Sequence, residues 1–108
     1  MATTADFIEY VCERLSPLCP VRYRKMFGEY AVYSGEKFIL LVCDNCVFVK
    51  KLPELADIME NAPCGDPYEG ASEHYILDIE NNELLERLVP VLVEFSAPPK
   101  KRRRKKLD

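Results

Sequence analysis

The chain has few residues of the kinds that build catalytic and cofactor sites. Its 108 residues include no tryptophan, one histidine (His74) and four glycines. The glycines form neither a dinucleotide-binding nor a P-loop spacing, so no phosphate-cradling loop is expected. His74 begins an expected strand and has no nearby serine or cysteine arrangement that indicates a triad. We therefore predict that the protein is not an enzyme and needs no cofactor.

Long hydrophobic runs are also missing. The longest apolar stretch, Phe38 to Cys43, falls far short of the roughly 20 residues that a membrane-spanning helix needs. Asp6, Glu9, Glu13 and Arg14 interrupt the N-terminal region, which therefore lacks the apolar core of a signal peptide. These absences predict a cytoplasmic protein with no membrane partner.

Cysteine is present in an odd number, which argues against a disulfide framework. The five residues are scattered through the chain, at Cys12, Cys19, Cys43, Cys46 and Cys64, and free thiols are expected. A zinc site at Cys43-x-x-Cys46 would need a second pair or added histidines. A redox pair would favour a helix N-terminus, but this pair flanks a strand turn. We interpret it as two small apolar residues closing a hairpin, with a metal or redox sensor as the alternative.

Charge is divided sharply between the two parts of the chain. Residues 100–108 hold seven Lys/Arg and one Asp, giving +6, whereas residues 1–99 hold eight Lys/Arg and seventeen Asp/Glu, giving −9. A run of like charge cannot pack, so we predict a folded domain at residues 1–97 and a basic, disordered tail at residues 98–108. The tail can bind polyphosphate by releasing counterions, without reading sequence. The alternatives are a solubilising tail or one that folds back on the acidic body. The candidate nucleic-acid contacts in the tail are Lys100, Lys101, Arg102, Arg103, Arg104, Lys105 and Lys106.

The pattern of apolar residues predicts three helices and five strands. The first helix follows the capping residues Thr3 to Asp6, the second begins at Pro53, and the third is capped by Asn81. Strands are expected at residues 21–27, 29–33, 37–43, 46–50 and 74–79. This pattern is typical of an α+β fold, with an antiparallel sheet of about five strands and packed helices in the order α-β-β-β-β-α-β-α.

The expected hairpin at residues 37–50 has a two-residue loop, Asp44-Asn45, and both loop residues tolerate the left-handed conformation. This loop sets the register, pairing Cys43 with Cys46, Val42 with Val47 and Leu41 with Phe48. Both faces are therefore apolar, whereas a sheet with one wet face should alternate. A helix, a loop or another chain must cover the second face, and we favour self-association as a homodimer.

Residues 24–50 combine several short motifs in a fixed order. They contain an Arg-x-Met-Phe-Gly-x-Tyr core, a turn, an apolar strand, an Asp-containing turn and a strand ending in Lys. The residues concerned are Arg24, Met26, Phe27, Gly28, Tyr30, Tyr33, Gly35, Phe38, Asp44, Phe48 and Lys50. This combination resembles the bacterial TfoX/Sxy N-terminal domain family, and the resemblance extends over nearly residues 4–97. It implies an α+β domain without enzymatic chemistry. Longer competence regulators of that family carry a second, C-terminal domain, which we expect this chain to lack.

The function that these observations predict is a non-enzymatic regulatory or adaptor domain. Its folded part would bind a protein partner or itself, and its tail would contact DNA or RNA non-specifically. Arg22, Arg24 and Lys25, interleaved with tyrosines, are further candidates for nucleic-acid contact. The alternative class is an enzyme or small-ligand-binding domain. It would use a pocket near four side chains: Tyr30, Tyr33, Tyr68 and His74.

Overall fold

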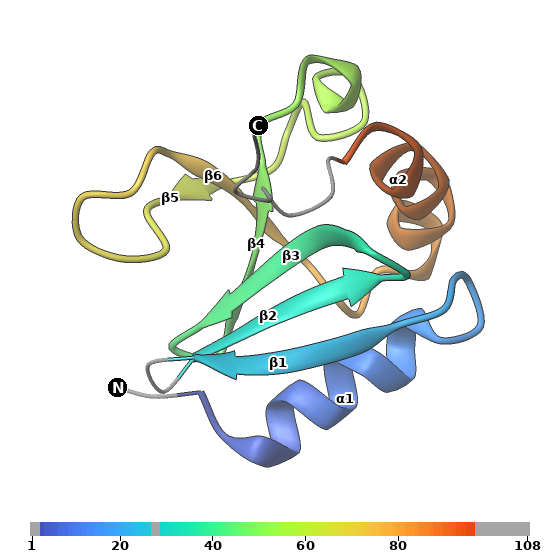
Figure 1. Cartoon of the computed structure of the whole chain (residues 1–108). Helices are drawn as coiled ribbons and strands as arrows, with labels where there is room; N and C mark the ends of the chain where they lie inside the picture. The colour runs from blue at the N-terminus through green and yellow to red at the C-terminus, as the bar shows by residue number, and fades with distance from the viewer. Residues whose placement is uncertain (1–2, 27–28, 97–108) are drawn as a thin grey trace, which may run out of the picture.

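A computed structural model describes residues 3–26 and 29–96 (Figure 1). Within these ranges the chain forms two α-helices, a 3₁₀ helix and six strands. In chain order these are α1 (Ala5–Leu15), β1 (Arg22–Met26), β2 (Glu29–Ser34), β3 (Lys37–Cys43), β4 (Cys46–Lys50), the 3₁₀ helix (Pro53–Leu55), β5 (Cys64–Gly65), β6 (His74–Leu77) and α2 (Asn82–Phe95). The strands form one antiparallel sheet in the order β1-β2-β3-β4-β6-β5. The α+β class predicted from the sequence is confirmed.

Each α-helix begins at a capping side chain, as the sequence predicts. Thr4 caps α1 by accepting a hydrogen bond of 3.2 Å from the Phe7 N–H. Asn81 caps α2 by accepting one of 3.1 Å from the Leu84 N–H. Both bonds satisfy backbone donors that have no partner inside the first turn. The two α-helices of the described residues have 11 and 14 residues, and neither is long and apolar enough to cross a membrane.

The turn between β3 and β4 sets the register of this hairpin. Asp44 and Asn45 have φ angles of 53° and 58°, as a two-residue turn with left-handed central positions requires. The observed register pairs Cys43 with Cys46, Val42 with Val47 and Leu41 with Phe48, which confirms the predicted pairing. A slip of one residue would turn every side chain to the opposite face, so this turn decides which side chains enter the core.

Both α-helices pack on one face of the sheet, and the main core lies between them and the strands. This core joins apolar residues from both helices and the 3₁₀ segment to alternate positions of the strands. Its fully buried members include Ile8, Val11, Leu15, Val32, Leu40, Val42, Val47, Val49, Leu55, Leu85, Leu88 and Leu92. The alternation follows from the pleat, which sends successive strand side chains to opposite faces.

The opposite, outer face of the sheet is also apolar, as predicted. Ala31, Tyr33, Cys43 and Phe48 are buried although they lie outside the main core cluster. Their burial arises within a single chain, so these side chains do not need a second copy to exclude water. Self-association stays a prediction.

The region after β4 differs from the predicted order. The expected second helix is reduced to the 3₁₀ helix Pro53–Leu55 and a run of turns up to residue 61. Only about two helical turns fit between Pro53 and Pro63, and such a short helix gains little cooperative stability. The loop expected at residues 62–72 contains the short strand β5, which pairs with β6. The observed order is therefore α-β-β-β-β-β-β-α.

Candidate interaction surface

β1 forms one edge of the sheet (Figure 1) and carries a cluster of exposed cations. It pairs with β2 on one side, and its other side meets no strand of the described residues. Arg22, Tyr23, Arg24 and Lys25 are all exposed. The structure thus brings the three predicted nucleic-acid contacts of the folded domain onto a single edge strand.

The pairing of β1 with β2 divides these side chains between the two faces. Arg22 lies opposite Tyr33 and Arg24 opposite Ala31, which places both arginines on the outer face. The guanidinium carbon of Arg22 lies 4.5 Å from the centre of the Tyr33 ring, a cation–π geometry. Its Nε donates a hydrogen bond of 3.1 Å to the Gly35 carbonyl. Arg22 is therefore held on the outer face, against β2 and the turn that follows it.

Tyr23 and Lys25 lie on the face that α1 covers. Tyr23 lies opposite Val32 and Lys25 opposite Tyr30. Tyr23 keeps 43% of its surface exposed, and its ring meets that of Tyr30 edge-to-face, with centroids 5.3 Å apart. An exposed aromatic ring beside cations is a surface suited to contact with another molecule.

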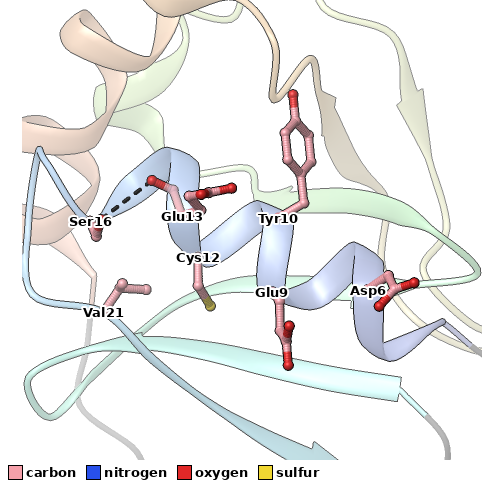
Figure 2. Close-up of a pocket in the computed structure, with 7 residues that line it drawn as sticks. All are labelled: Asp6, Glu9, Tyr10, Cys12, Glu13, Ser16 and Val21. Carbon is pink, nitrogen blue, oxygen red and sulfur yellow. Dashed lines mark hydrogen bonds between the residues drawn. The ribbon is translucent and has the colours of Figure 1, made fainter.

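A shallow, open hollow of about 540 Å³ lies along α1 beside the start of β1 (Figure 2). Figure 2 shows Glu9 and Cys12 directed to the same side of the helix. Burial and the nearby Glu9 carboxylate raise the pKa of the Cys12 thiol, which disfavours a reactive thiolate. The hollow is lined by Asp6, Glu9, Tyr10, Cys12, Glu13, Ser16 and Val21.

This acidic hollow is not among the sites predicted from the sequence. Asp6, Glu9 and Glu13 are spaced by three and four residues, so they share one face of α1. That spacing is the signal in the sequence from which an acidic face of the helix could be predicted. What the sequence does not show is that this face adjoins the edge strand, because the adjacency depends on how α1 packs.

The pocket considered as an alternative, near Tyr30, Tyr33, Tyr68 and His74, gains no support from the positions of these residues. Tyr30 belongs to the main core, whereas Tyr33 lies on the outer face under Arg22. His74 is on β6, separated from β2 by two strands, a distance of about 14 Å at normal strand spacing. Tyr68 is 61% exposed in the loop after β5. The four residues therefore do not converge on one site.

Cys43 and Cys46 lie directly opposite each other across the hairpin. Burial and the nearby carboxylates of Glu29 and Asp44 raise the pKa of the Cys43 thiol to about 11, which opposes the thiolate that redox and metal chemistry require. All five cysteines are free thiols. In the part of the chain that the structure describes, no group of three or more His, Cys, Asp or Glu residues could hold a metal ion. This geometry favours the interpretation as two small residues closing a hairpin.

The tail candidates, Lys100 to Lys106, lie outside the described residues. Their role stays a prediction from the sequence, as does the boundary between the domain at residues 1–97 and the tail at residues 98–108. The described chain ends at Ser96, which caps the C-terminus of α2 by donating its N–H to the Leu92 carbonyl.

Comparison with known proteins identifies the family. The family model of the TfoX N-terminal domain matches residues 13–85, which include β1 to β4 and the motif at residues 24–30. The chain is also 34% identical over 107 residues to a Spirochaeta aurantia protein described as "Uncharacterized 12.7 kDa protein in trpE 5'region". That match covers 97% of this chain and 93% of the relative. The chain therefore belongs to the TfoX N-terminal domain family, a family of regulatory-type domains.

Proposed function

We propose that the protein is a non-enzymatic regulatory adaptor. Its folded domain binds a protein partner through the surface around β1. Its basic segment, Lys100 to Lys106, contacts nucleic acid without reading sequence, with Arg22, Arg24 and Lys25 as secondary contacts. Membership of a family of regulatory-type domains supports this proposal.

The observation that carries the proposal is the uneven placement of positive charge. Of the eight Lys/Arg in residues 1–99, three fall within four residues of one exposed edge strand, and seven more are consecutive at residues 100–106. The seventeen carboxylates of residues 1–99 repel polyanions from most of the folded surface. The tail and β1 therefore carry the densest positive charge that a polyanion could contact.

The tail contribution is tested by the salt dependence of DNA binding. A labelled 20-bp duplex is titrated with the full chain at 50 and 200 mM salt. If all seven tail cations engage phosphates, affinity falls by about three to four decades between these salt concentrations. A variant with residues 100–106 changed to glutamine should lose most of this affinity and most of the salt slope.

The matched comparison is the variant R22Q/R24Q/K25Q, which removes cations from the folded domain and leaves the tail intact. Both variants should make DNA binding less dependent on salt. The change in salt slope for R22Q/R24Q/K25Q should be less than half of the change for the tail variant, because it removes three charges and not seven. Unchanged affinity and slope after neutralising the tail would overturn the nucleic-acid half of the proposal.

A further inference from the structure

The exposed edge of β1 has the features of a docking site for an extended peptide. We propose that a partner protein adds a strand to this edge, and that the added strand carries acidic side chains alternating with apolar ones. This inference rests on the adaptor function proposed above and names the chemical class of its protein partner.

The backbone of β1 provides the template. It has five residues and a partner strand on one side only, so its outer N–H and C=O groups face away from β2. Such an edge pairs readily with an extended chain through main-chain hydrogen bonds. β5, at the opposite edge of the sheet, has only two residues and offers too few groups for comparable pairing.

The charges on β1 specify what the added strand carries on the outer face. Arg22 and Arg24 both lie on that face, and their positions are two residues apart. An added strand would place alternate side chains beside them, with directly opposed Cβ atoms about 4.5–5.5 Å apart. Carboxylates at those positions form favourable cross-strand pairs with the guanidinium groups.

The other face requires a different residue type. Side chains of the added strand on this face would approach the exposed Tyr23 ring and the hollow along α1. Asp6, Glu9 and Glu13 line the hollow, so further carboxylates beside Tyr23 would be repelled. The one cation of β1 on this face, Lys25, lies farther along the strand, outside the lining of the hollow. Apolar side chains fit beside Tyr23 and Val21. The complementary sequence therefore alternates acidic and apolar residues.

The same charges disfavour the two competing occupants. In a symmetric antiparallel pairing of two copies, Arg24 would lie opposite the Arg24 of the second copy, and directly opposed like charges are destabilising. A nucleic-acid backbone carries phosphates along its whole length and would approach the carboxylates of α1 as well as the arginines, so β1 can add only secondary contacts to those of the tail. A peptide with alternating character avoids both conflicts.

The test uses a blocked peptide of alternating Glu and Val, seven residues long, titrated into the ¹⁵N-labelled full chain. We expect saturable binding, with amide shifts concentrated in β1, β2 and α1. Two N-methylated peptides test strand addition directly, one methylated at the Glu positions and the other at the Val positions. Only alternate N–H groups of an added strand face its neighbour, so one of the two should lose binding at least tenfold and the other should bind within about threefold of the parent.

Charge complementarity is tested with R22E/R24E and with the corresponding Lys-Val peptide. The variant should bind the Glu peptide at least tenfold more weakly and should prefer the Lys peptide. If the double variant does not fold, R24E alone serves as the test, because it keeps the contact between Arg22 and Tyr33. It should also bind the Glu peptide more weakly than the unmodified chain does. K50E/R87E changes the same net charge at exposed positions away from β1 and should bind like the unmodified chain.

Several outcomes would overturn the inference: no binding of the Glu peptide at millimolar concentration, equal binding of both methylated peptides, or equal effects of R22E/R24E and K50E/R87E. Shifts in β1 caused by the DNA duplex but not by the peptide would also overturn it, in favour of a nucleic-acid surface. Tail-dependent DNA binding in the same preparation would leave the nucleic-acid half of the proposed function intact. If the peptide binds but DNA binding does not depend on the tail, only the nucleic-acid half of the proposed function is rejected.

Discussion

At the scale of single residues, the Glu29 carboxylate connects three separate segments. Its Oε1 accepts hydrogen bonds from the Thr3 hydroxyl at 2.6 Å, the Thr3 N–H at 3.2 Å and the Asp44 N–H at 3.0 Å. The Thr3 hydroxyl in turn accepts one of 3.2 Å from the Asn45 N–H. The start of the chain, β2 and the β3–β4 turn thus meet at one side chain.

These hydrogen bonds make the contribution of Glu29 to stability depend on pH. Partial burial raises the pKa of Glu29, but the hydrogen bonds from Thr3 and Asp44 outweigh it, and the net pKa is below its ordinary value. The unfolded chain therefore binds more protons between the two pKa values. The stabilisation is complete above the unfolded pKa of about 4.3 and is lost as the pH falls through the folded pKa.

We expect Glu29→Gln to lower the free energy of unfolding by about 1 kcal/mol at pH 7, below the usual range for charged hydrogen bonds because the carboxylate is partly solvated. The difference from the unmodified chain should shrink toward pH 3. Urea unfolding at both pH values measures this. Glu36→Gln, at an exposed position in the β2–β3 turn, should change stability little at either pH. An equal loss at pH 7 and pH 3 for Glu29→Gln would contradict the assignment.

At the scale of elements, α2 contains an unfavourable residue at an exposed position. The helix runs from Asn82 to Phe95 with Pro90 inside it. Proline has no N–H to donate to the Glu86 carbonyl four residues earlier, and its ring crowds the preceding turn. Leu85, Leu88, Val89 and Leu92 remain buried on both sides of it, so tertiary packing outweighs this local cost.

Pro90→Ala should therefore stabilise the protein, by roughly 1–3 kcal/mol, because alanine restores the hydrogen bond and helix propensity. The thermal midpoint and the helical circular dichroism signal should both rise. Pro17→Ala, which lies after the end of α1, serves as the comparison and should change stability by less than about 0.5 kcal/mol. A Pro90→Ala variant no more stable than the unmodified chain would show that packing depends on a bend at this position.

The success of sequence-based prediction also differs between elements. The bounds of β3 and β4 and their register follow from local turn chemistry at Asp44-Asn45, so they could be predicted in full. The 3₁₀ helix and β5 could not, because their conformations depend on distant partners. Gly65 in β5 packs so close to β6 that an added Cβ would lie 3.2 Å from Ile76 Cδ1, and two residues carry no periodicity from which a strand could be inferred.

The candidate surface illustrates the same limit. The cations of β1 were identified from sequence because they lie within four successive residues, interleaved with tyrosine. The neighbouring acidic hollow was not, because it requires knowing that α1 packs beside the edge strand. Contacts that join residues far apart in the chain carry no local signal, and such contacts decide the arrangement of the whole molecule.

At the scale of the whole molecule, Arg14 links the first helix to the segment that leads into the last one. Its Nε donates a hydrogen bond of 3.0 Å to the Ile79 carbonyl, and its Nη2 donates to the Glu80 carbonyl at 3.1 Å and to Asn82 Oδ1. The Tyr10 hydroxyl adds a bond of 3.3 Å to Glu80 Oε2. These residues are 65 to 70 positions apart, so the fork of one arginine holds α1 against the β6–α2 connection.

Arg14→Lys should weaken this link, because a lysine ammonium cannot reproduce the planar fork. We expect a loss of about 1–2 kcal/mol in the free energy of unfolding, below the full value for charged hydrogen bonds because the site is partly solvated. Arg87→Lys, at an exposed position of α2, should cost less than about 0.5 kcal/mol. Urea unfolding gives both values, and hydrogen exchange of the α1 amides separates local release from global loss. If α1 is held mainly by Ile8, Val11 and Leu15 in the core, Arg14→Lys will leave stability and exchange unchanged, and the linking role of Arg14 will be wrong.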